Sequence, residues 1–192
     1  MSAKEEKINF RDRDILFVDL ETTGLDFEKH EILEVGCLLV NGRLLSIKEK
    51  YYAKVRPMHL EIASEEALRI SKYSEVEWRD AKPLEKILKD IAKLAPNAMV
   101  AGWKVDFDWY FLEKGFKKYN IKHSFDYHLI DCISIAYYYF RDKKEPAELR
   151  LGSVCRTLEI PIHEKHGEGE GHGAMTDILA TFEVFKKLTG AK

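Results

Sequence analysis

The alternation of apolar and polar residues predicts that the chain begins with strands. Residues 15–18 form an apolar run bounded by charges and by a Thr-Thr-Gly turn, which predicts a buried strand that stops at Gly24. A second apolar run covers residues 31–40. The Asn-Gly pair at 41–42 predicts a type I′ hairpin turn into a third strand, in which apolar and polar residues alternate up to Pro57. The chain therefore opens as a three-stranded β-meander.

The remainder of the chain predicts helices that alternate with short strands. Ser64 and Asp80 are candidate N-caps of two helices, and Pro83 is tolerated in the first turn of the second. The expected elements are helices from Ser64 to Ile70 and from Asp80 to Leu94, a strand over 97–102, a helix over 105–119, a strand over 124–129, and helices near 131–140, 150–158 and 174–188. This order predicts an α/β domain with a mixed sheet.

Length and composition narrow the class of protein. The 192 residues contain no Pro/Gly/Ser-rich linker, so we expect one domain over residues 1–192, with a flexible N-terminus at about 1–10. No apolar run approaches the length of a membrane span, and the N-terminus lacks a signal-peptide core, so we expect a cytoplasmic protein without membrane contact. Three scattered cysteines predict no disulfide framework. A net charge of −2 argues against a protein that coats long nucleic acid through charge alone.

Two acids end the first apolar run. Side chains of a strand alternate between its faces, so Asp19 and Glu21 point the same way, opposite to Val18 and Leu20. Two like charges held side by side repel each other, and a divalent cation with oxygen ligands would turn that repulsion into coordination. The pair is therefore a candidate metal site, and the alternative is a strand end that carries two solvated acids.

A third acid falls on the apolar stripe of the helix expected over 105–119. Asp108 lies three residues after Val105 and four before Leu112, so it points inward and needs a metal, a cation or backbone N–H groups as its partner. The expected stripe consists of Val105, Trp109, Leu112, Phe116 and Tyr119. Capping of the helix N-terminus is the alternative for Asp108 and the favoured interpretation for Asp106.

The last helix repeats this pattern. Asp177 shares a stripe with Ala174 and Thr181, whose small side chains would let the helix approach the sheet closely. Just upstream, His172 follows a glycine-rich segment at 167–171, which has little intrinsic order. His172 could act as a general base near neutral pH, although a histidine beside a helix start is more often a surface residue.

Cysteine and histidine residues near the C-terminus suggest a zinc site as another hypothesis. Cys155, His163, His166 and His172 are the candidate ligands. Their spacing fits no standard zinc finger, so we do not favour this hypothesis.

Taken together, Asp19-x-Glu21, the inward Asp108 and His172 five residues before Asp177 resemble the motifs of the DEDDh-type 3′-to-5′ exonucleases. That family includes ribonuclease T, oligoribonuclease and the proofreading epsilon subunits of bacterial replicases. The resemblance covers nearly the whole chain: residues 19–25 look like the first motif, residues 55–57 like the end of the third strand, and residues 151–161 like the helix before the last motif.

Two details of the motifs refine the resemblance. The sister group that uses tyrosine would need Tyr where this chain has Gly173, so the histidine assigns the chain to the DEDDh type. The family usually has Gly-His-Asn before its second motif, whereas this chain has Gly102-Trp103-Lys104. This departure leaves the four carboxylates intact and leaves the neighbouring substrate contacts open.

The resemblance implies a fold, a cofactor and a reaction. The fold would be a ribonuclease-H-like mixed sheet of five strands flanked by helices, with the meander followed by βα units. Asp19, Glu21, Asp108 and Asp177 would hold two Mg²⁺ or Mn²⁺ ions, and His172 would be the general base. The lining of the terminal nucleotide would consist of Thr22, Gly24 and Leu25. The implied substrates are 3′ ends of single-stranded DNA or RNA, the products are nucleoside 5′-monophosphates, and a DNA polymerase subunit is a candidate partner.

Other functions remain open at the level of sequence. A nucleic-acid-binding module on a disabled exonuclease fold would be expected to lack one of the five active residues, and all five are present. A metal-dependent phosphatase of the aspartyl-phosphate type would require an aspartate where this chain has Glu21. The aromatic run at 137–140 could stack on bases, although helical spacing favours core and helix-surface positions. The sequence does not distinguish DNA from RNA.

Overall fold

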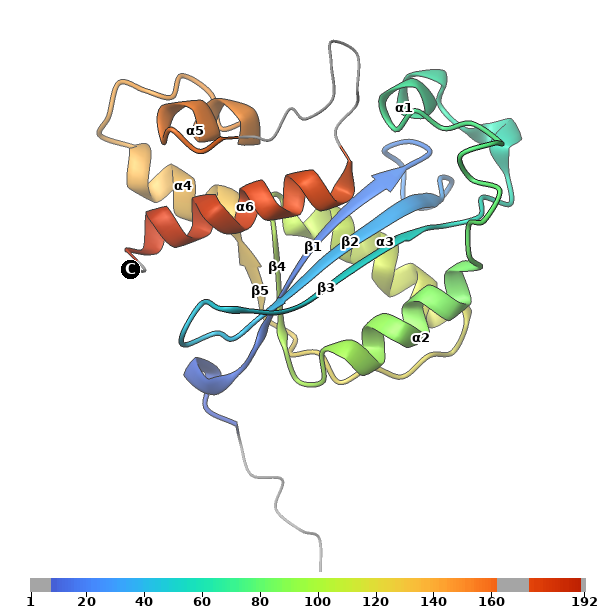
Figure 1. The fold of residues 1–192 in the computed structure, drawn as a ribbon, viewed down its shortest axis with the longest axis horizontal. Helices are drawn as coiled ribbons and strands as arrows, with labels where there is room; N and C mark the ends of the chain where they lie inside the picture. The colour runs from blue at the N-terminus through green and yellow to red at the C-terminus, as the bar shows by residue number, and fades with distance from the viewer. Residues whose placement is uncertain (1–7, 162–172, 191–192) are drawn as a thin grey trace, which may run out of the picture.

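The computed structural model describes residues 8–161 and 173–190. A single mixed sheet has the strand order β3-β2-β1-β4-β5 (Figure 1). β1 pairs antiparallel with β2 and β2 antiparallel with β3, while β1, β4 and β5 run parallel. The strands are β1 (Ile15–Thr22), β2 (Ile32–Val40), β3 (Ile47–Lys54), β4 (Met99–Gly102) and β5 (Leu129–Asp131). The α/β class, the five-stranded mixed sheet and the opening meander are therefore confirmed.

Helices cover both faces of this sheet (Figure 1). α2 and α3 pack against one face, and α6, supported by α4 and α5, packs against the other. The helical elements are η1 (Phe10–Asp12), η2 (Leu60–Ile62), α1 (Glu65–Ile70), α2 (Leu84–Leu94), α3 (Val105–Lys118), α4 (Cys132–Phe140), α5 (Leu151–Thr157) and α6 (Ala174–Thr189). Within the described ranges, no helix combines the length and the apolar character that a membrane crossing requires.

The two faces of β1 lie in different parts of the core. The even-numbered residues 16–20 belong to the apolar cluster with α2 and α3, whereas Ile15 and Phe17 pack against α6. Because side chains alternate along a strand, Asp19 and Glu21 continue the series that faces α6. The predicted orientation of this pair, opposite to Val18 and Leu20, is therefore confirmed.

The turn between β2 and β3 differs from the prediction. The sequence predicts a two-residue type I′ turn at 41–42, whereas residues 41–46 join the strands. The Asn41 side-chain oxygen accepts the backbone N–H groups of Arg43 and Leu44 at 3.1 and 2.8 Å, so it organises a longer turn. Gly42 is required by close packing, since a Cβ there would lie 2.1 Å from the backbone oxygen of Arg13.

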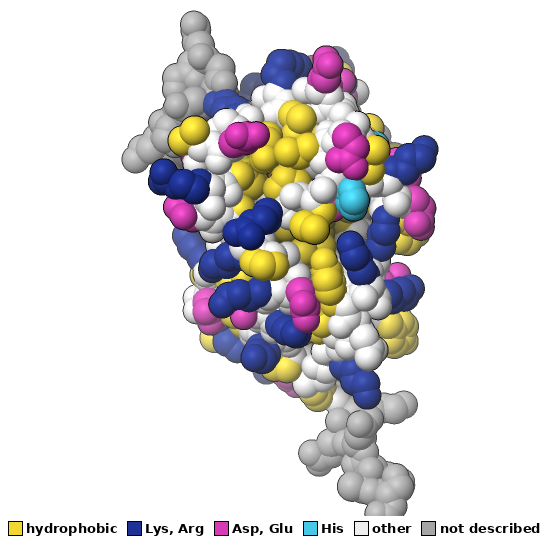
Figure 2. Space-filling model, turned by 90° about the vertical axis from the view of Figure 1, so that its right-hand side faces the viewer, with side chains coloured by type: hydrophobic (Ala, Val, Ile, Leu, Met, Phe, Trp, Pro, Cys, Tyr) yellow, Lys and Arg dark blue, Asp and Glu magenta, His cyan; other side chains and the backbone are white. Residues whose placement is uncertain are grey.

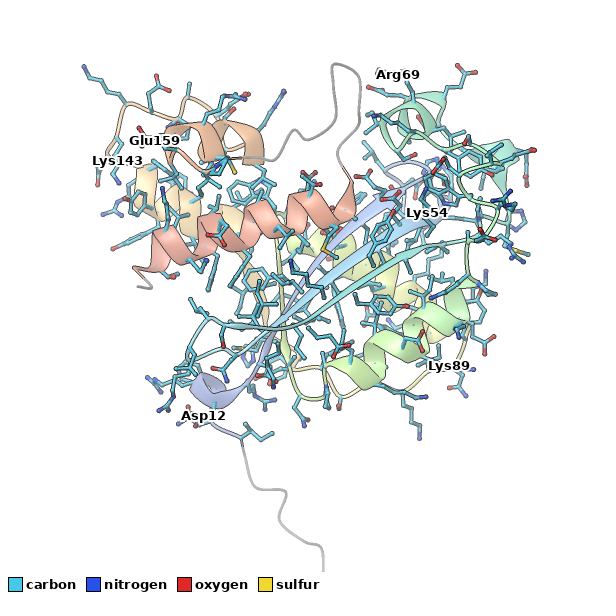
Figure 3. All side chains as sticks on the ribbon, in the orientation of Figure 1. Asp12, Lys54, Arg69, Lys89, Lys143 and Glu159 are labelled. Atoms are coloured by element: carbon cyan, nitrogen blue, oxygen red, sulfur yellow. The ribbon has the colours of Figure 1, made fainter. Side chains whose placement is uncertain are left out.

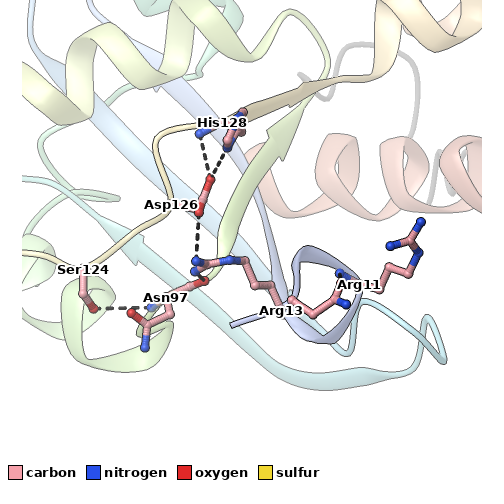
Figure 4. Close-up of polar contacts among 7 residues, drawn as sticks. Arg11, Arg13, Asn97, Ser124, Asp126 and His128 are labelled. Carbon is pink, nitrogen blue, oxygen red and sulfur yellow. Dashed lines mark hydrogen bonds and ion pairs between the residues drawn. The ribbon is translucent and has the colours of Figure 1, made fainter. Parts of the chain in front are cut away.

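The fifth strand begins later than predicted. The sequence predicts it over 124–129, but β5 starts where that segment ends. The Asp126 carboxylate pairs with Arg13 at 3.1 Å and accepts the backbone N–H of His128 at 3.0 Å (Figure 4). Phe125 packs within a cluster of rings beside α3. Side-chain contacts and single backbone hydrogen bonds, such as that from the N–H of Asp126 to the oxygen of Ala98 at 2.9 Å, thus hold this segment, and the regular ladder with β4 begins at Leu129.

Asp80 does not cap α2, so that prediction is wrong. Pro83 occupies the N-cap position, and Asp80 is exposed. The backbone between Asp80 and Pro83 pairs with the end of β3 instead of forming a helix. The N–H of Lys82 donates to the oxygen of Lys54 at 2.9 Å, and Lys82 forms a β-bridge with Val55. The chain therefore stays extended up to the proline and turns into a helix after it.

The buried stripe of α3 is rotated relative to the predicted one. Trp109 and Tyr119 are half-buried, whereas Phe111 and Gly115 occupy core positions that the prediction did not give them. Gly115 lets α2 come close, since a Cβ there would lie 2.8 Å from a methyl group of Leu88. This contact draws the face of α3 that carries Gly115 onto α2.

Candidate functional site

The site forms where β1 extends past its parallel neighbour. The described pairing of β1 with β4 ends at Phe17, so the following residues of β1 project beyond that ladder. Asp19 and Glu21 lie on this projecting part, and Asp177 lies in the first turn of α6. One carboxylate oxygen from each of these three residues lies within 4.8 Å of the other two. The sheet and α6 therefore bring together acids that are far apart in the sequence.

Asp108 reaches the same region from α3. Its side chain is 4% exposed, as the predicted inward orientation requires. The Oδ1 atom accepts the backbone N–H of Leu20 at 3.0 Å, so Asp108 ties the start of α3 to the projecting end of β1. Burial raises the pKa of Asp108 well above its usual range, while the hydrogen bond from Leu20 opposes that rise.

The carboxylates raise the pKa values of one another. The pKa of Asp19 lies well above its usual range, because of burial first and then because of the charges of Asp108, Asp177 and Glu21. Burial is also the main cause of the rise in the pKa of Glu21 to about 8, and the charge of Asp177 adds to it. A cluster of oxygen donors with this much unrelieved like charge fits a hard divalent cation such as Mg²⁺ or Mn²⁺.

A fifth acid, Glu34 on β2, belongs to this site and was missed by the sequence reasoning. It pairs directly opposite Glu21 in the antiparallel ladder and is 6% exposed. The Tyr52 hydroxyl and the backbone N–H of Ala174 lie beside its carboxyl group and act to lower its pKa. Burial nevertheless raises its pKa. The available signal was that Glu34 is the only charged residue between positions 32 and 40.

Glu34 and Gly36 together form a seat for the N-terminus of α6. A Cβ at Gly36 would lie 2.7 Å from the backbone oxygen of Ala174, so only glycine allows the helix to start so close to β2. The residue before the helix, Gly173, offers no side-chain cap, and the Glu34 carboxyl group of the neighbouring strand lies beside the N–H of Ala174. Lys54 lies at the same end of the sheet (Figure 3) and lowers the pKa of Glu34. This seat fixes the first turn of α6, which carries Asp177.

A pocket of about 340 Å³ adjoins the carboxylates and contains the three residues expected to line a terminal nucleotide. Its wall combines Glu21 with Thr22, Gly24 and Leu25 from the end of β1, and with apolar side chains of α1 and α3. Thr22 is buried and donates its hydroxyl to the Gly24 oxygen at 2.8 Å, whereas Leu25 is 83% exposed. The structure therefore places these residues beside the acids. The pocket and the acids share Glu21, and we refer to this hollow as the β1 pocket.

Several predicted residues lie outside the described ranges. These are His172, the glycine-rich segment 167–171, and the zinc candidates His163 and His166. Of the zinc candidates, Cys155 lies within the described residues. It belongs to α5 and is buried in an apolar cluster.

The residues that depart from the family pattern serve the local structure. The indole N–H of Trp103 donates to the Leu149 oxygen at 3.2 Å. Lys104 precedes α3 in the left-handed backbone region with φ 62°, and its N–H donates to Asp131 at 3.1 Å. Asp106 is exposed in the first turn of α3, where an acid is favourable because of the helix dipole.

The aromatic run on α4 divides between the core and the surface, as its helical spacing predicts. Phe140 packs in the core, whereas Tyr137 and Tyr138 are more than half exposed. Arg141 lies over the ring of Tyr138, 4.1 Å from its centroid. These rings belong to a different helix from those that carry the carboxylates.

A family model and several known proteins match most of this chain. The RNase_T family model, described as an exonuclease, matches residues 16–185. The DNA polymerase III subunit epsilon of Aquifex aeolicus is 25% identical over 94% of this chain and 82% of its own length. The PolC-type DNA polymerase III of Thermotoga maritima is 26% identical over 92% of this chain. The chain spans only 12% of that much longer relative.

Two further similar proteins are a probable oligoribonuclease and an exonuclease solved with an oligonucleotide. A probable oligoribonuclease of Schizosaccharomyces pombe is 27% identical over 86% of this chain and 63% of its own length. A crystal structure of E. coli Exonuclease I in complex with a dT13 oligonucleotide superposes with a TM-score of 0.75. It shares 18% sequence identity and covers 92% of this chain and 41% of the exonuclease chain, so it supports the fold.

Proposed function

The chain belongs to the RNase_T exonuclease family, and we propose that it is a metal-dependent 3′-to-5′ exonuclease. Its substrates would be 3′ ends of single-stranded DNA or RNA, and its products nucleoside 5′-monophosphates. The observation that carries the proposal is the cluster of Asp19, Glu21 and Asp177, which lies beside the β1 pocket. Acids and pocket together would bind a phosphodiester and the nucleotide attached to it.

The metal ligands in this proposal are the four predicted carboxylates. Asp19, Glu21 and Asp177 offer oxygens within one ion's reach, and Asp108 adjoins Asp19, whose pKa it raises. We propose that these four residues hold two Mg²⁺ or Mn²⁺ ions. When bound, such ions neutralise charge on the scissile phosphate and lower the pKa of water.

The remaining roles fall to other residues of the chain. We propose that an imidazole nitrogen of His172 accepts the proton of the attacking water. The apolar wall of the β1 pocket would hold the terminal base, with Leu25 at its exposed edge. The buried hydrogen bond between Thr22 and Gly24 would keep that wall in shape. Glu34 would hold Asp177 in place through the start of α6.

The biological setting is also a proposal. Relatives include polymerase III chains and a probable oligoribonuclease, so both DNA and RNA are candidate substrates, and association with a polymerase subunit is a candidate role. A non-catalytic or weakly catalytic nucleic-acid-binding module on the same fold is the alternative. The presence of all four carboxylates favours the enzyme.

The proposal is tested with single-stranded DNA, single-stranded RNA and duplexes with blunt ends or 3′ overhangs, each labelled at the 5′ end. With Mg²⁺, we expect a ladder of products that shorten one nucleotide at a time from the 3′ end, and faster cleavage of single strands than of blunt duplex. Excess EDTA should abolish this cleavage. Shortening from the 5′ end, or full activity in EDTA, would contradict the proposal, and binding without cleavage would favour the alternative.

A further inference from the structure

A second hollow lies next to the β1 pocket and has a different character. It encloses about 330 Å³ between residues 28–32, residues 55–59, the start of α2 and the second half of α3. We call it the basic groove. Figure 2 shows a face of the molecule where hydrophobic side chains gather in the middle, with many Lys and Arg side chains and some Asp and Glu side chains around them.

The basic groove and the β1 pocket share two walls. On one side, Gly24 of the pocket lies against His30 of the groove so closely that a Cβ would come within 2.5 Å of the imidazole. On the other, Phe107 of the pocket and Phe111 of the groove occupy successive turns of α3, with ring centroids 5.1 Å apart. A polymer with its end in the pocket would therefore reach the groove within a short length.

Cations outnumber acids along the groove, and its acids already have partners. Four Lys and Arg residues line it, against two glutamates. The Glu31 carboxylate accepts the backbone N–H groups of Met58 and His59 at 2.7 and 2.8 Å. Lys114 lies 4.0 Å from the Glu28 carboxylate.

Two of these cations remain available to a ligand. Within residues 8–161 and 173–190, no carboxylate lies at ion-pair distance from Arg56 or Lys118. Arg56 donates one hydrogen bond, from Nη2 to the oxygen of Ala81 at 3.1 Å, which leaves its other N–H groups for a ligand. Both side chains are exposed.

Resting on the proposed function, we propose that the basic groove binds the nucleotides upstream of the 3′ end in a single-stranded substrate. Phosphates would lie on Arg56 and Lys118, and bases against the floor of the groove, which includes Leu84 and the half-buried ring of Tyr119. Proteins that hold single strands without sequence preference combine a positively charged groove with aromatic side chains on which bases stack. The shared walls favour the continuation of one polymer over a separate acidic protein segment.

Substrate length provides the test. We compare the double variant Arg56→Gln/Lys118→Gln with wild type on 5′-fluorescein-labelled oligothymidylates, a dinucleotide and a dodecanucleotide, in Mn²⁺. The control is Lys117→Gln, which removes one positive charge from the helix that carries Lys118, at a residue that pairs with Glu113 at 3.3 Å and does not line the groove. For the dodecanucleotide we expect KM to rise about tenfold in the double variant, with kcat unchanged and the salt dependence weakened by about two phosphate contacts. The dinucleotide should show no change in KM.

The proposal for the groove would be wrong if KM rose equally for both lengths, if it rose equally in the control, or if it did not rise. None of these outcomes would contradict the proposed function. Fluorescence anisotropy of the dodecanucleotide in EDTA separates the two failures: weaker binding by the double variant supports the groove even if wild type cleaves nothing. A peptide of alternating Glu and Phe is the last probe. If it loses affinity for the double variant while the oligonucleotide does not, the groove binds protein and the proposal is wrong.

Discussion

The carboxylate cluster and the basic groove place charge in opposite ways. In the cluster, acids from β1, α3 and α6 are held together by the fold, and burial and like charge raise the pKa values of Asp19 and Glu21. In the groove, Arg56 and Lys118 extend into solvent around an apolar floor. Folding therefore forces the first set of charges together and leaves the second set free.

This difference assigns different kinds of work to the two regions. Buried like charges store an unfavourable interaction that a bound cation relieves, so changes in the cluster should appear in metal binding, turnover and stability. Exposed cations on long stems interact weakly and are screened by salt, so changes in the groove should appear in substrate affinity alone. Variants of the cluster test one side of this comparison, and the length dependence described above tests the other.

The largest effect is expected for Asp19→Asn. Asp19 lies in the three-residue cluster and also adjoins Asp108, so its loss should abolish tight Mn²⁺ binding and reduce turnover by more than about 10³-fold. The same variant relieves like charge, so in EDTA it should melt at a higher temperature than wild type. Mn²⁺ titration, single-turnover cleavage and thermal denaturation measure the three effects. Wild-type metal affinity in Asp19→Asn would contradict the assignment.

His172→Ala should separate catalysis from metal binding. It leaves the carboxylates in place, so Mn²⁺ affinity should change little, while turnover should fall by roughly 10²–10⁴-fold, as is typical for loss of a positioned general base. Mn²⁺ titration and single-turnover cleavage measure these two effects. If His172→Ala releases nucleotides within about threefold of the wild-type rate, the histidine is not the base.

Glu34 should have an intermediate effect, as a positioning residue. Glu34→Ala removes the carboxyl group that lies beside the N–H of Ala174 and the hydroxyl of Tyr52 and leaves these polar groups without it, so it should destabilise the protein by about 1–3 kcal/mol. Because the start of α6 carries Asp177, Mn²⁺ affinity should also fall by about 10–100-fold, the range for groups that orient metal ligands.

Glu34→Gln is the matched control for this role. Its amide oxygen can accept from one of the two donors, and it removes the charge opposite Glu21, so stability and metal affinity should stay closer to wild type than in Glu34→Ala. Urea denaturation gives the stability, and Mn²⁺ titration gives the affinity. Equal metal affinity in Glu34→Ala and wild type would leave Glu34 with a purely structural role.

The sequence predicts the cluster better than its surroundings for a physical reason. Asp19, Glu21 and Asp108 were found from local periodicity, because alternation in a strand and spacing in a helix fix which way a side chain points. The role of Glu34 depends on the register between β1 and β2, and the displacement of β5 depends on contacts of Asp126 with the distant Arg13. Periodicity contains no information about such long-range partners.

The same limit applies to the basic groove. Its walls come from residues 28–32, residues 55–59, α2 and α3, which lie far apart in the sequence, so the sequence does not show that their side chains line one hollow. The rotation of α3 that brings Phe111 inward depends on the contact of Gly115 with Leu88. The basic groove could therefore be recognised only once the packing of α2 against α3 was known.

The smallest expected effect is a dependence of stability on pH that only the cluster should show. The pKa of Glu21 rises from 4.5 to about 8 in the folded protein, so between these values the folded state binds more protons than the unfolded state. Stability from this group is therefore fully present below pH 4.5 and is lost as the pH rises through about 8. Asp19 and Asp108 shift in the same direction. In EDTA, we expect the melting temperature to fall between about pH 6 and pH 9.

Three controls make this prediction specific to the cluster. Glu21→Gln removes the titrating group, so it should flatten the decline, and saturating Mg²⁺ should do the same because a bound cation stabilises the ionised carboxylates. Lys118→Gln in the groove should leave the pH profile as it is in wild type, since Lys118 is not among the groups that shift the pKa values of Asp19 and Glu21. If the melting temperature in EDTA does not change with pH, the carboxylates ionise as readily in the folded protein as in the unfolded one. The contrast between the two regions would then rest on exposure alone.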